Sequence, residues 1–101
     1  MADTIRRSLR GVDVVARLGG DEFAILLPET GHDPGALVLR KVQKSVLDVT
    51  ATNRWPVTVS IGAVTCTSPT RTIAELVKVA DGHMYAVKHA GKNGIRHVVL
   101  G

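Results

Sequence analysis

The chain has 101 residues, of which 45% are hydrophobic and 22% charged, and its formal net charge is +4. These values fit one globular domain with a single core, they exclude a disordered chain, and the positive charge favours anionic partners. No apolar run approaches the roughly 18 residues of a membrane span, no signal peptide follows Met1, and a single cysteine excludes an internal disulfide, so the sequence predicts a cytoplasmic protein.

The first third of the chain predicts the end of a helix followed by a β-hairpin. Residues 2–9 carry apolar side chains four apart among arginines, which is typical of the last turns of a helix. The apolar runs 12–18 and 23–27 flank the turn residues 19–22, so we expect two paired strands. The tip of this hairpin would consist of Gly19, Gly20, Asp21 and Glu22.

The middle of the chain predicts a long helix and a strand. Asp33 and Pro34 resemble an N-cap and a first helical residue. The apolar stripe expected on this helix consists of Leu37, Val38, Val42, Val46 and Val49. After a break, residues 57–64 predict a central strand.

The last third predicts another helix and a short strand. Thr72 and Glu75 form a capping box at the helix start, and Gly91 occupies the position expected of a C-terminal glycine. Residues 95–100 are apolar and predict a closing strand.

This order of elements predicts an α+β sandwich of the ferredoxin-like kind. We expect a mixed, mostly antiparallel sheet with helices packed on a face. A ferredoxin-like fold normally opens with a strand, and none precedes the first helix fragment. The sequence therefore predicts one partial domain over residues 1–101, with its first strand missing.

The hairpin tip has the composition of a nucleotide–metal site. Without Cβ atoms, Gly19 and Gly20 let backbone amides approach a phosphate closely. Asp21 is a hard-oxygen ligand of the kind that Mg²⁺ prefers, together with the phosphates themselves. A hairpin with a solvated acidic tip has the same composition, so both interpretations stay open.

Three segments resemble the GGDEF domain, the catalytic module of bacterial diguanylate cyclases. RLGGDEFAILLPET at residues 17–30 resembles its signature hairpin, VTVSIGAV at 57–64 resembles the strand after its long helix, and ADGHMYAVKHAGKN at 80–93 resembles its closing helix and turn. The resemblance implies a palm-like nucleotidyl-cyclase fold. It also implies that two paired domains, each holding one GTP, form cyclic di-GMP with Mg²⁺ or Mn²⁺.

The resemblance also assigns roles to residues of the hairpin and the last helix. The implied catalytic residues are Asp21, which would bind the metal and activate the attacking hydroxyl, and Glu22, its electrostatic and metal-shell neighbour. The implied substrate contacts are Gly19, Gly20, Lys88 and Lys92. Lys88 and Lys92 are four residues apart, and without the resemblance this spacing is usually that of a solvated basic face.

A second implied site lies upstream of the hairpin. Arg10 and Asp13 are three residues apart, a spacing that ordinarily gives a weak local ion pair. In the family, an RxxD motif at this distance from the glycines is the inhibitory site that binds cyclic di-GMP. Arg40 or Lys41 on the next helix is placed to complete it, and Lys41 is our candidate.

The sequence departs from the family pattern at its start. The family's first strand carries a metal-binding aspartate, and the segment after it recognises guanine; neither is found here. We therefore expect low or no turnover by this chain alone, and open ladder edges in the middle of the sheet. A homodimer, a strand-exchanged oligomer or a longer parent chain with a sensor domain would fill the gap.

Two functions follow from these expectations. The chain is either part of a working diguanylate cyclase or a catalytically incomplete module that binds cyclic di-GMP or pairs with another copy. Nucleic-acid binding is disfavoured, because only three aromatic residues are present and they form no stacking platform.

Overall fold

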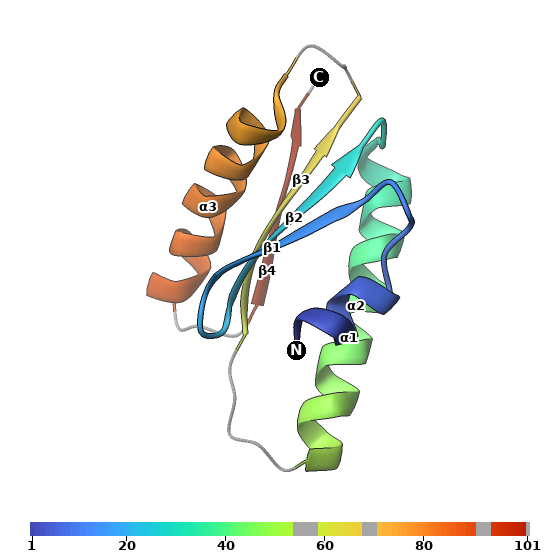
Figure 1. Cartoon of the computed structure of the whole chain (residues 1–101), viewed down its shortest axis with the longest axis vertical. Coiled ribbons are helices and arrows are strands. Elements are labelled where there is room, and N and C mark those ends of the chain that lie inside the picture. The colour runs from blue at the N-terminus through green and yellow to red at the C-terminus, as the bar shows by residue number, and fades with distance from the viewer. Residues whose placement is uncertain (54–58, 68–70, 91–93, 101) are drawn as a thin grey trace.

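The computed structural model describes residues 1–53, 59–67, 71–90 and 94–100 (Figure 1). Three helices and four strands follow one another along the chain and form an α+β fold with a mixed sheet, as predicted. Their order is α1 (Ala2–Arg7), β1 (Val14–Gly19), β2 (Glu22–Pro28), α2 (His32–Asn53), β3 (Ser60–Cys66), α3 (Ile73–His89) and β4 (Gly94–Leu100). Within these ranges, no helix is long and apolar enough to cross a membrane.

The sheet has the strand order β1-β2-β3-β4. β1 and β2 form the predicted antiparallel hairpin, whereas β2–β3 and β3–β4 are parallel pairs. The expectation of a mostly antiparallel sheet is therefore wrong. The reason is that α2 and α3 each carry the chain back to the same end of the sheet, so that the strands they connect run in the same direction.

β2 and β3 pair directly with each other, from Glu22 opposite Ser60 to Pro28 opposite Cys66. The expected open edges in the middle of the sheet are therefore absent among the described strands. The backbone amides and carbonyls of β2 and β3 form hydrogen bonds with one another. Strand exchange is thus not needed to complete this ladder.

Helices cover both faces of the sheet (Figure 1), where the sequence led us to expect helices on one face. Along β2, Phe23, Ile25 and Leu27 belong to the core beneath α1 and α2, and Ala24 and Leu26 belong to the core beneath α3. The unbroken apolar run of β2 is the pattern of a strand buried on both faces. A second core under α3 follows from that pattern.

The start of α2 differs from the prediction, and the start of α3 agrees with it. α2 begins at His32, one residue before the predicted cap, and it buries Leu39 instead of Leu37, whose side chain is 58% exposed. The capping box at the start of α3 is confirmed, because the Thr72 hydroxyl accepts a hydrogen bond from the Glu75 amide at 3.2 Å. The predicted C-terminal glycine, Gly91, lies outside the described residues.

α3 lies unusually close to β3 at Gly62. A Cβ atom at this position would overlap the backbone carbonyl of Ala80 and the amide of Met84. A glycine in the centre of a strand normally weakens it. Here the missing side chain lets the helix backbone touch the sheet.

We expect Gly62→Ala to lower the free energy of unfolding by about 3 kcal/mol, because the added methyl group meets helix backbone that cannot rotate away. Gly82→Ala is the matched control: it adds a methyl group on α3 with no atom within 4 Å, and it should be neutral or raise stability by about 1 kcal/mol through helix propensity. Urea unfolding of both variants measures this difference. Equal stability of the two variants would contradict the close approach of α3.

A histidine pair joins the start of α2 to β4. The rings of His32 and His97 stack with their centroids 5.5 Å apart, and the Nε2 atom of His97 lies 3.0 Å from the Thr65 hydroxyl. Burial lowers the pKa of His97 from its usual 6.5, and the neighbouring His32 lowers it further. The folded protein therefore favours neutral His97.

This pKa shift makes stability depend on pH. The unfolded chain takes up the His97 proton near pH 6.5, before the folded chain does, so the free energy of unfolding should fall as the pH drops below that value. His97→Phe keeps a ring but cannot titrate, and it should flatten the stability profile between about pH 7 and pH 5. Urea unfolding at several pH values, with His83→Phe on α3 as control, measures the slope. An unchanged slope in His97→Phe would contradict this assignment.

Candidate functional site

The glycines and carboxylates singled out in the sequence form the turn between β1 and β2. Gly19 pairs with Glu22, the ladder is irregular between Arg17 and Gly19, and two residues, Gly20 and Asp21, make the turn. A Cβ atom on Gly19 would collide with the Glu22 carboxylate, whereas Gly20 faces open space. The first glycine therefore makes room for an acid, and the second leaves the main chain accessible.

A cavity of about 270 Å³ opens beside this turn. It is lined by Met1, Ala2, Asp3, Arg17, Gly20, Asp21 and Phe23. The Arg17 Nε atom donates to the carbonyl oxygens of Gly19 and Gly20, at 3.2 and 3.3 Å, and the Asp21 carbonyl accepts from the Ser60 amide at 2.9 Å. Arg17, two residues before Gly19, was not predicted as a site residue.

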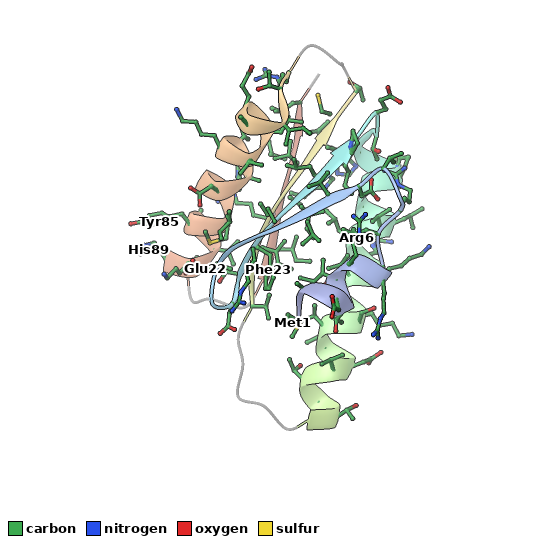
Figure 2. The ribbon with its side chains drawn as sticks, in the orientation of Figure 1. Met1, Arg6, Glu22, Phe23, Tyr85 and His89 are labelled. Atoms are coloured by element: carbon green, nitrogen blue, oxygen red, sulfur yellow. The ribbon has the colours of Figure 1, made fainter. Side chains whose placement is uncertain are left out.

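The last helix meets the hairpin tip through an ion pair. The Lys88 Nζ atom of α3 lies 2.5 Å from the Glu22 Oε1 atom, and the two side chains are 44% and 22% exposed. Figure 2 shows Glu22 beside the end of α3 that carries Tyr85 and His89. The hydrogen bond to Glu22, and then its charge, raise the pKa of Lys88. The structure thus brings together two of the predicted site residues, whereas Lys92 lies outside the described residues.

The donor set at the tip fits a cation only in part. Within the described ranges, no group of three or more His, Cys, Asp and Glu side chains could hold a metal ion. Glu22 is already paired with Lys88, which leaves Asp21 as the exposed carboxylate of the turn. Mg²⁺ commonly takes one or two carboxylates and completes its shell with phosphate oxygens and water. The turn therefore fits a cation that arrives with a phosphate ligand.

A second cavity, of about 550 Å³, lies between the end of α1 and α2. We call it the basic cavity; its lining residues are Arg7, Ser8, Leu9, Arg10, Val38, Lys41, Lys44 and Ser45. It contains two of the three predicted inhibitory-site residues, Arg10 and Lys41. Arg40 lines a different cavity, together with Ile95 and His97.

Two cations of the basic cavity were not singled out as site residues from the sequence. Arg7 precedes Arg10 by three residues, and Lys44 follows Lys41 by three. Lys41 and Lys44 lie within α2 and share one side of it, so their spacing was the available signal, whereas α1 ends at Arg7 and the sequence offered no such signal for the two arginines. Four positive side chains therefore surround one cavity.

The RxxD motif forms an ion pair between the buried Asp13 and the partly exposed Arg10. The Asp13 carboxylate, in a residue only 1% exposed, accepts hydrogen bonds from three nitrogens of Arg10: the amide at 2.8 Å, Nε at 2.9 Å and Nη2 at 2.8 Å. The bond to Asp13 raises the pKa of Arg10. The Arg6 guanidinium also donates a hydrogen bond to the backbone carbonyl of Asp13. Asp13 therefore holds the turn between α1 and β1 together, and it holds Arg10 at the rim of the basic cavity.

Comparison with known proteins supports the resemblance seen in the sequence. A family model described as "Diguanylate cyclase, GGDEF domain" matches residues 1–94. The chain is 35% identical to "Diguanylate cyclase DgcM" of Escherichia coli K12 over 95 residues, which are 94% of this chain and 23% of that protein. It is 34% identical to "Bifunctional diguanylate cyclase/cyclic di-GMP phosphodiesterase MucR" of Pseudomonas aeruginosa over 96 residues, which are 93% of this chain and 14% of that protein.

A third relative, "Uncharacterized protein YhcK" of Bacillus subtilis, is 32% identical over 95 residues, which are 90% of this chain and 26% of that protein. The chain thus spans about a quarter or less of the length of these relatives. No solved structure gives a significant match. Since the family model covers nearly all of the sequence, the chain belongs to the GGDEF domain family of diguanylate cyclases.

Proposed function

We propose that this chain supplies the phosphate- and metal-binding part of a diguanylate cyclase domain. The complete domain, paired with a second copy, would condense two GTP molecules to cyclic di-GMP with Mg²⁺ or Mn²⁺. The observation that carries this proposal is the 2.5 Å contact between Lys88 and Glu22. Through this contact, the Lys88 ammonium lies at the same corner of the molecule as the carboxylates of Asp21 and Glu22 and the open backbone of Gly20.

Each of these groups has a role in phosphoryl transfer. The 3′-hydroxyl of each GTP would attack the α-phosphorus of the other, each attack would break the bond to pyrophosphate, and Asp21 of each domain would accept the hydroxyl proton. A metal ion held at the turn would supply positive charge that offsets the charge developing on the phosphate oxygens. Asp21 would hold this metal ion, and Gly20 leaves room for the phosphates. Lys88 would leave its ion pair with Glu22 and bind a phosphate.

We further propose that the 101 residues alone turn over GTP slowly. Phosphoryl transfer depends mainly on positioning and on metal charge. The described residues offer Asp21 as the exposed carboxylate of the turn and no cluster of three metal ligands. Pairing with another copy, a sensor domain in a longer parent chain and a cytoplasmic location remain predictions.

A second function is favoured by the basic cavity. We propose that cyclic di-GMP binds there, with Arg10 and Lys41 contacting its phosphates and Asp13 holding Arg10 in place. A cavity of about 550 Å³ with four cations on its wall suits a ligand with two phosphodiester groups. Such binding would operate in an active cyclase and in a catalytically incomplete module alike.

We expect Lys88→Met to weaken GTP binding about tenfold, because it removes a charge-assisted contact to phosphate. Asp21→Asn should weaken binding only when Mg²⁺ is present. Isothermal titration of GTP with and without Mg²⁺ separates the two effects, and Lys78→Met, on the exposed surface of the same helix, is the matched control. If both site variants bind GTP as the control does, the proposed nucleotide site is wrong.

Neighbouring residues of α2 give a matched test of the basic cavity. Lys41→Ala should weaken cyclic di-GMP binding by about tenfold at low salt, because Lys41 lines this cavity. Arg40→Ala removes the same charge from a different cavity and should leave the affinity unchanged. Titration calorimetry compares the two variants. A larger loss in Arg40→Ala would move the site to the other side of the helix.

A further inference from the structure

A buried threonine two residues after β2 contacts Arg10 of the basic cavity. Glu29 adopts a left-handed backbone conformation with a φ of 50°, and the turn that it makes leaves the following residue, Thr30, only 2% exposed. The Arg10 Nη2 atom donates to the Thr30 Oγ1 atom at 2.5 Å. Thr30 thus lies 20 residues from Arg10 in sequence and in direct contact with it.

The Thr30 hydroxyl has a fixed orientation. It donates its one hydrogen to the Pro28 carbonyl at 2.8 Å, so its lone pairs are left to accept from Arg10. The Thr30 amide donates to the Cys66 carbonyl at 3.1 Å, at the end of β3. The hydroxyl that receives the guanidinium is therefore anchored to the ends of both central strands.

These contacts use two of the three guanidinium nitrogens of Arg10 and leave one for a ligand. The Nε atom and one Nη2 hydrogen of Arg10 go to Asp13, and the second Nη2 hydrogen goes to Thr30. No described residue accepts a hydrogen bond from Nη1. Arg10 lines the basic cavity, and its side chain is 43% exposed. A planar guanidinium held on two of its nitrogens leaves the third to contact an anion.

We propose that Thr30 is a positioning residue for the basic cavity: its hydroxyl holds Arg10 in the orientation that leaves Nη1 free to bind a phosphodiester. This inference rests on the proposed binding of cyclic di-GMP in that cavity. A long arginine side chain loses rotamer freedom when it binds, and fixing it beforehand lowers that cost. Asp13 fixes one edge of the guanidinium, and Thr30 fixes the remaining Nη2 hydrogen.

Two substitutions at one position separate the hydroxyl from the packing. Thr30→Val keeps the side-chain shape and the hydrogen bond from the backbone amide to the Cys66 carbonyl, but it removes the hydroxyl that accepts from Arg10. We therefore expect the Kd for cyclic di-GMP to rise about tenfold. Thr30→Ser restores the hydroxyl and should restore the affinity to within about threefold of the wild type. Thr50→Val is the matched control, since its hydroxyl bonds only to α2 carbonyls, and it should bind as the wild type does.

Titration calorimetry with cyclic di-GMP measures these affinities, and urea unfolding of each variant is recorded in parallel. Arg10→Lys tests the inference without changing Thr30. Lysine keeps the charge but cannot donate to Asp13 and Thr30 at once through a planar guanidinium. It should bind about tenfold more weakly. Wild-type affinity in Thr30→Val or in Arg10→Lys would overturn the positioning role.

The outcomes separate this inference from the proposed function on which it rests. If Arg10→Ala loses binding while Thr30→Val binds as the wild type does, the cavity is a binding site and the role of Thr30 is wrong. If the wild type gives no heat with cyclic di-GMP, both the binding site and the positioning role fail. Weak binding by Thr30→Val, with recovery in Thr30→Ser, supports both.

Discussion

The direct pairing of β2 with β3 is the constraint on which both candidate sites depend. These two strands are buried on both faces and run parallel from Glu22 and Ser60 to Pro28 and Cys66. At one end, the Ser60 amide binds the carbonyl of Asp21 in the hairpin turn. At the other end, the Thr30 amide binds the Cys66 carbonyl. One ladder therefore fixes the hairpin tip and, through the contact of Thr30 with Arg10, one side chain of the basic cavity.

The packing of α3 turns the hairpin tip into a candidate nucleotide site. Gly62 lets the helix backbone touch β3, and the end of the helix then meets the hairpin. At that end, Lys88 of α3 pairs with Glu22 of the hairpin. An ion pair on a half-exposed surface adds little stability, and in the proposed function it would hold the Lys88 ammonium where an anionic ligand can take it.

Features set by neighbouring residues could be predicted from the sequence, and features set by long-range pairing could not. The glycine-tipped hairpin and the capping box of Thr72 depend on residues within a few positions of each other, and both are found. The direct pairing of β2 with β3 depends on which strands meet, and the expectation of open edges was wrong. The choice of Lys41 over Arg40 had no physical basis in the sequence, because adjacent helical side chains point about 100° apart and only the packing of α2 shows which one lines the same cavity as Arg10.

Amide hydrogen exchange of the 101-residue chain, followed residue by residue by NMR, tests the central claim most directly. If β2 and β3 pair as described, the amides of Ile25 and Ala63, which lie opposite each other, should be among the slowest to exchange and should open only with global unfolding. Nuclear Overhauser contacts between the two strands should accompany this protection. Fast exchange along β2 or β3, or contacts that arise only between different molecules, would contradict the account.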